Sequence, residues 1–349
     1  MYRNIIRPIL FLLQPETVHH LIVNILKIGF KIPGIGNLIR NLYTFQDNSL
    51  KTNFLGMELE NPVGFAAGFD KNAEVYNQFS NFGFSFIEIG TVTPVAQKGN
   101  PKPRSFRIPK DKGLINRMGF NNKGVDYAIN QLQKNQHRVI IGGNIGKNTA
   151  TTNEDALNDY IICFEKLYDH VDYFVVNLSC PNIKDLRKLQ DKDSTIMILN
   201  KLTQLRRDKS LYKPILLKIS PDLTDNQLDD VVETFNITGI DGLVATNTTV
   251  SRENLKTDKK QVDEIANGGL SGKPLSKRST EIIKYISDKS DCAIPIIGVG
   301  GIMSEQDALD KIEAGATLIQ IYTGFIYEGP GFVKRINKAL LKKKKLVNN

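Results

Sequence analysis

The sequence predicts an α/β fold, a (β/α)8 TIM barrel with a helical extension at its N-terminus. From residue 53 onward, eight apolar runs alternate with segments of helical periodicity. Nearly every apolar run ends in small or polar residues, and in a barrel of parallel strands these ends gather on one face, where active sites lie. A doubly wound open sheet is the alternative, but such a sheet usually has fewer strands and one fingerprint loop.

The eight predicted strands are short and apolar, which is typical of strands buried on both faces. They span residues 61–68, 84–92, 138–146, 173–179, 215–220, 242–247, 294–301 and 318–324. Helical periodicity is clearest at residues 155–168, 225–235, 277–286 and 304–314. Thr224 and Ser304 are the predicted N-caps of the second and the fourth of these helices.

Two segments depart from the alternation. Residues 104–118 predict a hairpin that turns at Lys110–Gly113. Residues 182–193 predict a charged loop directly after Cys180. A long polar loop beside a site is either a lid or a simple connection, and the sequence leaves both open.

Residues 1–46 predict three short helices with apolar stripes, the second starting at Pro15. We therefore expect a helical segment at 1–46 and a barrel domain at 47–349. No run approaches the ~20 apolar residues of a membrane-spanning helix. The helices could pack on the barrel or lie in a bilayer interface, and the pattern fits both equally.

The composition is that of a globular protein, with 41% apolar and 24% charged residues. The three cysteines and four histidines show no disulfide or metal-ligand spacing, so we predict a reduced setting and no metal. The net charge of +9 is made of +4 in residues 1–46, +7 in residues 331–349 and −2 between them. Basic ends on a near-neutral middle argue against a nucleic-acid groove and favour an anionic membrane surface; for the terminal lysine run, a solvated tail is the simpler interpretation.

Several strand ends carry side chains that suit catalysis or ligand binding. Cys180 follows the strand at 173–179, where a thiol with a lowered pKa could act as a base, although a lone cysteine can also be an apolar filler. Lys218 lies inside an apolar strand and needs a partner, such as a phosphate-bearing cofactor that becomes anionic. Gly300-Gly301 and Tyr322-Thr323 suit phosphate binding. Asparagines suit a planar ligand with amide edges; they are Asn116, Asn144, Asn177, Asn182 and Asn247.

Over nearly its whole length the chain resembles dihydroorotate dehydrogenase. The matching segments are AAGFDK (66–71), EIGTVTP (88–94), NRMGFNN (116–122), NIGKN (144–148), NLSCPN (177–182), KISPDL (218–223), ATNTT (245–249), GGLSGKPL (268–275), IIGVGGI (296–302) and QIYTGFIY (320–327). NRMGFNN and the helical N-terminus resemble the quinone-linked, membrane-associated class. The resemblance implies oxidation of dihydroorotate to orotate with FMN and a membrane quinone, in pyrimidine (UMP) biosynthesis, on the cytoplasmic side of the cell membrane.

The resemblance also assigns residues by position. FMN would be held by Ala67, Gly68, Lys71, Thr91, Asn144, Asn177, Lys218, Thr246, Gly272, Gly301, Tyr322 and Thr323. The substrate would be surrounded by Lys71, Asn116, Arg117, Met118, Gly119, Phe120, Asn177, Asn182, Asn247 and Thr248. Cys180 would be the base, Lys218 would stabilise negative charge on reduced flavin, and the quinone would pass His19, Arg107 and Tyr322.

Two positions differ from the quinone-linked class. That class usually has serine at the position of Cys180, and its lid usually begins Thr-Pro-Gly where this chain has Ile183-Lys184-Asp185. The cysteine favours the alternative of a soluble enzyme of the same family that uses fumarate or a partner subunit. A third alternative, from another class, is a non-redox phosphate-binding barrel or a membrane-recruited binding protein.

Overall fold

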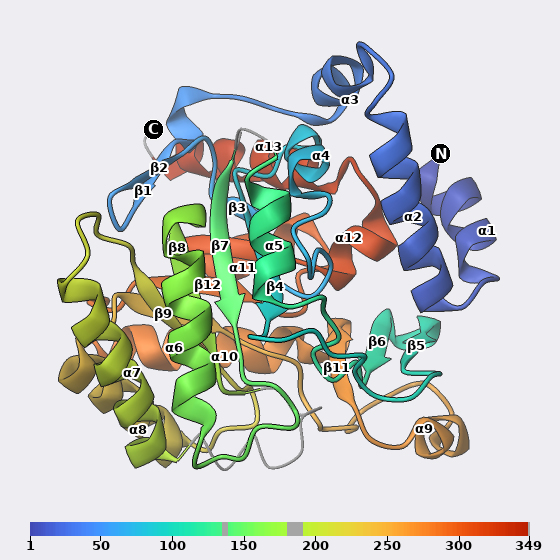
Figure 1. The fold of residues 1–349 in the computed structure, drawn as a ribbon. Coiled ribbons are helices and arrows are strands. Elements are labelled where there is room, and N and C mark those ends of the chain that lie inside the picture. The colour runs from blue at the N-terminus through green and yellow to red at the C-terminus, as the bar shows by residue number, and fades with distance from the viewer. Residues whose placement is uncertain (135–138, 180–190, 348–349) are drawn as a thin grey trace.

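Eight parallel strands form a closed barrel at the centre of the molecule (Figure 1). The computed structural model describes residues 1–134, 139–179 and 191–347. Around the barrel the strands are β3 (Val63–Phe65), β4 (Phe86–Val92), β7 (Ile140–Ile145), β8 (Tyr173–Asn177), β9 (Ile215–Ile219), β10 (Gly242–Ala245), β12 (Ile296–Val299) and β13 (Leu318–Ile321). Each lies within one of the eight predicted runs, so the barrel prediction is confirmed.

Helices surround the barrel and cover the outer face of its strands (Figure 1). As predicted, Thr224 caps α8 (Asp225–Thr238) with a full capping box, and Ser304 caps α11 (Glu305–Glu313) by accepting a hydrogen bond from the Asp307 amide. The helices after the first three are α4 (Tyr76–Phe79), α5 (Val125–Leu132), α6 (Ala156–Leu167), α7 (Lys192–Arg207), α8 (Asp225–Thr238), α9 (Lys259–Ile265), α10 (Ser276–Lys289), α11 (Glu305–Glu313), α12 (Thr323–Glu328) and α13 (Phe332–Val347).

Large aromatic rings fill the barrel interior at the amino-terminal ends of the strands. The ring of Phe86 lies over Gly64, where a Cβ atom would come within 2.3 Å of it, and Tyr173 lies over Gly142 in the same way. The hairpin of β1 (Thr52–Phe54) and β2 (Met57–Leu59) adds apolar side chains to this cluster. This end is therefore a packed floor, and ligands must enter from the other end.

A second, antiparallel sheet lies beside the barrel mouth. It contains β5 (Ser105–Ile108), β6 (Gly113–Asn116) and β11 (Gly269–Gly272), in the order β11-β6-β5. The first two strands form the predicted hairpin. Strand β11 was not predicted, because its glycine-rich sequence has no strand pattern and its partner lies about 150 residues away.

The N-terminal helices pack against one side of the barrel mouth. After a π-helical turn (Tyr2–Ile6) come α1 (Arg7–Phe11), α2 (Pro15–Gly29) and α3 (Ile35–Tyr43). Glu16 of α2 accepts two hydrogen bonds from Arg104 beside the second sheet, at 2.7 and 3.2 Å. The Tyr2 hydroxyl donates to the carbonyl of Ile326 on α12, at 2.7 Å. The segment is thus held to the rest of the protein near its first residues and at the start of α2.

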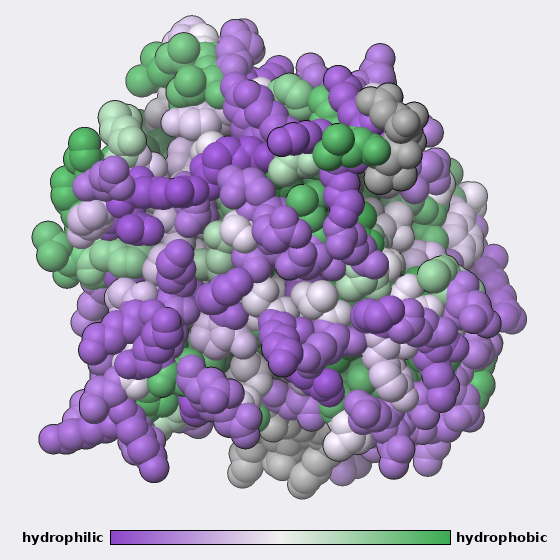
Figure 2. Space-filling model, turned by 180° about the vertical axis from the view of Figure 1, so that it is seen from behind, coloured by the Kyte–Doolittle hydropathy of each residue, from purple (hydrophilic) through white to green (hydrophobic). Residues whose placement is uncertain are grey.

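The outer face of these helices is apolar. Figure 2 shows apolar side chains along the edge of the molecule where this segment lies. The exposed large residues there are Met1, Ile5, Ile6, Ile9, Leu12, Leu13, Leu21, Ile25, Ile28, Ile32, Leu38 and Leu42. Among the described residues no single helix is long and apolar enough to cross a membrane, whereas Tyr2–Phe11 and Pro15–Gly29 meet that test together as a pair bent by 119°.

Candidate active site

A cavity of about 410 Å³ begins between the N-terminal helices and ends at the barrel mouth. Its outer part is lined by apolar residues of α1 and α2, including Leu10, Val18 and Ile22. Its inner part is lined by the polar ends of the barrel strands, including Asn177 and Lys218. A volume of this size is typical of sites for cofactors and other small ligands.

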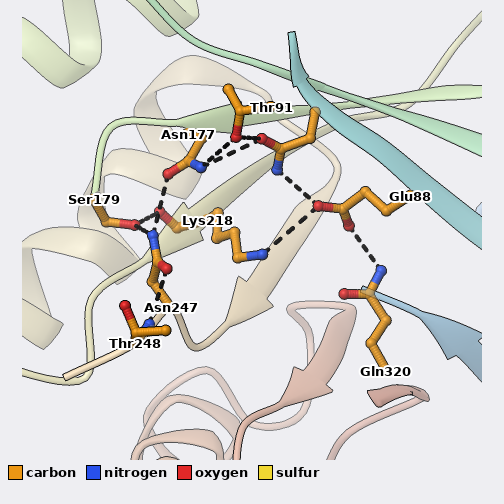
Figure 3. Close-up of polar contacts among 9 residues, drawn as sticks. Glu88, Thr91, Asn177, Ser179, Lys218, Asn247, Thr248 and Gln320 are labelled. Carbon is orange, nitrogen blue, oxygen red and sulfur yellow. Dashed lines mark hydrogen bonds and ion pairs between the residues drawn. The ribbon is translucent and has the colours of Figure 1, made fainter. Parts of the chain in front are cut away.

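A network of amide and hydroxyl groups links the ends of four strands (Figure 3). The Asn177 amide nitrogen donates to Thr91 Oγ1 at 3.0 Å and to Asn144 Oδ1 at 3.3 Å. The Asn247 amide nitrogen donates to Asn177 Oδ1 at 3.2 Å and to Ser179 Oγ at 3.0 Å. Each amide orients the next, so Asn177 and Asn247 are fixed at the cavity wall before any ligand binds.

Lys218 is buried in β9, and its ammonium lies 3.7 Å from the Glu88 carboxylate of β4 (Figure 3). Glu88 also accepts hydrogen bonds from the side chains of Asn144 and Gln320, both at 2.7 Å. From the sequence we expected a partner for the buried Lys218. The structure provides one such partner within the protein, the buried carboxylate of Glu88.

The loops after β11 and β12 bring backbone amides close to the cavity. Gly301 has φ +73°, and a Cβ atom there would lie 2.2 Å from Cα of Ser276. Gly272 has φ +94°, and a Cβ atom there would lie 2.3 Å from the carbonyl oxygen of Lys112. Thr323 donates to the Ser271 hydroxyl at 2.8 Å. Only glycine fits the first two positions, which keeps the backbone exposed to a ligand.

Lys71 also lines the cavity, in the loop after β3. Its ammonium donates to the carbonyl of Gly68 at 2.6 Å. Burial, and secondly the charge of Arg104, lower the pKa of Lys71 to about 8. The neighbouring Asp70 carboxylate accepts the amides of Glu74 and Val75 at 2.7 and 2.8 Å, which holds the loop in place.

The three residues of the predicted quinone path all line the cavity. His19 packs its ring edge-on against Phe69, and burial lowers its pKa to about 3, so the imidazole is neutral at physiological pH. Arg107 lies over the ring of Phe11, 4.5 Å from its centroid. Burial raises the pKa of Tyr322 to about 12 and keeps its hydroxyl protonated.

The chain matches the family model for dihydroorotate dehydrogenase over residues 49–343. The chain belongs to the dihydroorotate dehydrogenase family. A relative from Christiangramia forsetii, named dihydroorotate dehydrogenase (quinone), is 53% identical, and the alignment covers 98% of this chain and 99% of the relative. One from Neisseria meningitidis serogroup B with the same name is 44% identical, with 96% and 98% covered. A crystal structure of the enzyme from Eimeria tenella in complex with ferulenol superposes with a TM-score of 0.86 at 35% identity, covering 96% and 92%.

Most residues assigned by resemblance to this dehydrogenase family line the cavity. They are Ala67, Gly68, Lys71, Thr91, Asn116, Met118, Gly119, Phe120, Asn177, Lys218, Thr246, Asn247, Thr248, Gly272, Gly301, Tyr322 and Thr323, together with His19 and Arg107 in the outer part. The predicted base Cys180, the predicted substrate ligand Asn182 and the start of the lid at 183–185 lie outside the described residues.

Two assigned residues are placed elsewhere. The Arg117 guanidinium points away from the cavity: it lies over Phe106, 4.7 Å from the ring centroid, and donates to the carbonyls of Pro103 and Ile265. Arg117 thus joins the hairpin to the end of α9. Asn144 is fully buried behind the cavity wall, where it orients Thr91 and Asn177.

The sequence reasoning missed Glu88 and Gln320. Both are polar residues inside otherwise apolar barrel strands, and both are buried. This is the same signal that marked Lys218 in its strand. Applied to every strand, it would have identified Glu88 and Gln320 as well as Lys218, although not their contacts.

Proposed function

We propose that this chain oxidises dihydroorotate to orotate in pyrimidine (UMP) biosynthesis, with FMN as the first and a membrane quinone as the final electron acceptor. The observation that carries the proposal is a continuous cavity that joins the polar barrel mouth to the apolar N-terminal helices. A redox cofactor in the barrel mouth could then meet a water-soluble substrate on one side and a lipid-soluble acceptor on the other.

The residues of the barrel mouth fit FMN. Asn177 and the network behind it offer amide groups to the edge of a planar ring, and Lys218 offers a positive charge. Gly272, Gly301 and Thr323 offer backbone amides and a hydroxyl to a phosphate. FMN, when bound, supplies the hydride acceptor and can pass the electrons on one or two at a time.

The remaining polar groups suit the substrate. Dihydroorotate carries a carboxylate and a ring with amide edges, which Lys71, Asn116 and Asn247 can bind at the cavity wall. Cys180 is the proposed base, which takes the proton from C5 while the hydrogen on C6 leaves as hydride. Lys218 stabilises the negative charge that remains in the barrel mouth.

The outer part of the cavity suits a quinone. Its walls are apolar residues of α1 and α2, with the neutral imidazole of His19 as one of few polar groups. A neutral imidazole can hydrogen-bond a quinone carbonyl without placing in the apolar cavity a charge that would be costly to desolvate. Residues 1–46 are therefore the proposed quinone-access segment, and residues 47–349 the proposed catalytic barrel.

The apolar outer face of residues 1–46 supports peripheral attachment to the cytoplasmic side of the cell membrane. Exposed side chains such as Leu12 and Leu38 are flanked by basic residues, among them Arg3 and Lys31. An apolar face with a basic rim is typical of segments that lie in the interface of an anionic bilayer. The attachment would place the opening of the cavity where quinone is dissolved.

The first test is the visible spectrum of the purified protein, followed by dihydroorotate-dependent reduction of a short-chain quinone. A flavin spectrum and quinone turnover are expected. A colourless protein would refute the FMN proposal, and turnover with fumarate but not with quinone would establish the soluble alternative, which Cys180 favours.

The second test separates the quinone path from the flavin site. Deletion of residues 1–46 should abolish quinone reduction while FMN stays bound and dihydroorotate still bleaches it. Because deletion exposes apolar surface, Ile22→Trp offers a milder test, since Ile22 lines the cavity. Ile28→Trp is the matched control on the exposed face of α2, where the side chain is 67% exposed. Full quinone turnover in both the deletion and Ile22→Trp would refute the proposed path.

The membrane proposal is tested by sedimentation with vesicles that contain anionic lipid. Leu12→Glu combined with Leu38→Glu should release the protein from the vesicles. Leu211→Glu is the control, because this residue is 64% exposed but lies outside the N-terminal segment. Equal binding of both variants would contradict attachment through residues 1–46.

A further inference from the structure

Glu88 is a carboxylate in the interior of the barrel, with only 1% of its surface exposed. Both of its oxygens are occupied: Oε1 accepts from Asn144 and Oε2 from Gln320, each at 2.7 Å. Lys218 lies 3.7 Å from Oε1 (Figure 3). Four barrel strands, β4, β7, β9 and β13, thus each contribute one side chain to this group.

A buried carboxylate is costly, and an apolar side chain would fill the same space without that cost. The floor beneath Glu88 is made of aromatic rings, among them Tyr173, whose pKa is raised well above its usual value by burial and secondly by Glu88. Above Glu88, Lys218 and Gln320 line the cavity. The carboxylate therefore lies between a packed floor and the proposed flavin site. A charged side chain at this position does not serve the stability of the fold, so its role is expected to lie in the flavin site.

We propose that Glu88 sets the reduction potential of the flavin by holding Lys218 in place and offsetting its positive charge at the flavin. This inference rests on FMN binding as proposed above. Glu88 holds the lysine side chain at the barrel centre, and its negative charge offsets part of the lysine's positive charge. Lys218 then stabilises the reduced, anionic flavin less than an unpaired buried lysine would.

An intermediate potential suits the two half-reactions. Two electrons enter as hydride from dihydroorotate, whose second hydrogen leaves as a proton, and both electrons leave to a quinone, which takes up two protons. A lysine without its carboxylate would favour the first transfer and hinder the second. A site without the lysine would do the opposite.

The test is the flavin reduction potential of Glu88→Gln, measured by equilibration with a redox dye. Loss of the carboxylate should shift the reduction equilibrium at least tenfold toward reduced flavin, about 30 mV for a two-electron couple. Flavin reoxidation by quinone should slow in parallel. Lys218→Met should shift the equilibrium in the opposite direction.

Asp241→Asn is the matched control. Asp241 is a carboxylate paired with Arg206 at the amino-terminal start of β10, at the opposite end of the barrel from the cavity. Its loss should leave the potential unchanged. If Glu88→Gln binds FMN and its equilibrium constant for flavin reduction lies within twofold of the wild-type value, the inference is overturned.

A charge-balanced variant covers the case in which Glu88→Gln does not fold. Glu88→Gln combined with Lys218→Met leaves no unpaired buried charge. The equilibrium constant for flavin reduction in this double variant should return to within threefold of the wild-type value. Equal potentials in Lys218→Met with and without Glu88→Gln would also overturn the inference. A wild-type protein without flavin would refute the proposed function instead, so the two failures are distinguishable.

Discussion

Lys311 of α11 is expected to make the stability of this protein depend on pH. Its side chain is fully buried, and its ammonium donates to the carbonyl of Ser276 at 3.0 Å and to Thr280 Oγ1 at 2.6 Å. Burial lowers the pKa of Lys311 from 10.5 to about 7, although Asp307 opposes this change. The folded state therefore binds this proton much more weakly than the unfolded chain does.

The sign and size of the effect follow from that difference. Between pH 7 and 10.5 the unfolded chain binds the proton and the folded state largely does not, so the free energy of unfolding rises with pH. Each pH unit across most of this window adds at most about 1.4 kcal/mol, and the rise from pH 7 to pH 9 amounts to about 2 kcal/mol. Below pH 7 the contribution levels off at its least favourable value.

Urea unfolding followed by circular dichroism at pH 7, 8 and 9 measures this effect. Lys311→Met removes the titrating group, so the stability of the wild type relative to this variant should rise by about 2 kcal/mol from pH 7 to pH 9. Lys284→Met is the control, because that lysine lies on the exposed face of α10. A difference between wild type and Lys311→Met that stays constant with pH would refute the reasoning.

Three further predictions concern the site. Cys180→Ala should slow flavin reduction by dihydroorotate about 100-fold or more while orotate binds almost normally. An unchanged rate would exclude Cys180 as the base. Activity of the wild type should also begin at lower pH than activity of Cys180→Ser, because a thiol ionises more readily than a hydroxyl. Orotate affinity, measured by flavin absorbance, should fall as pH rises above about 8, because Lys71 loses its proton there. Lys71→Arg should abolish that pH dependence. An orotate affinity of the wild type that does not change with pH would contradict this prediction. Gly301→Ala should weaken FMN binding at least tenfold, because the new Cβ would lie 2.2 Å from Cα of Ser276. Gly239→Ala is the control, because Gly239 also has a positive φ of +65° but has open space around it. Equal FMN affinity of the two variants would show that crowding at Gly301 does not matter.

Much of the fold could be predicted because its signals are local. A buried strand shows an apolar run, and a helix start shows a capping residue, so the eight barrel strands and the caps at Thr224 and Ser304 were found from neighbouring residues alone. The closed barrel then follows from the number of strands, and the shared face of their polar ends follows from the barrel.

The sequence by itself therefore determined the barrel, the family resemblance and most of the residues around the cavity. The tertiary structure decided which way side chains point and which distant segments meet. It turned Arg117 toward the end of α9, paired β11 with β6, and joined Glu88 to Lys218 across the barrel. The physical reason is that such contacts depend on groups far apart in the chain, whose spacing no local pattern records. The same holds for the cavity, whose outer wall comes from α1 and α2 and whose inner wall comes from the barrel.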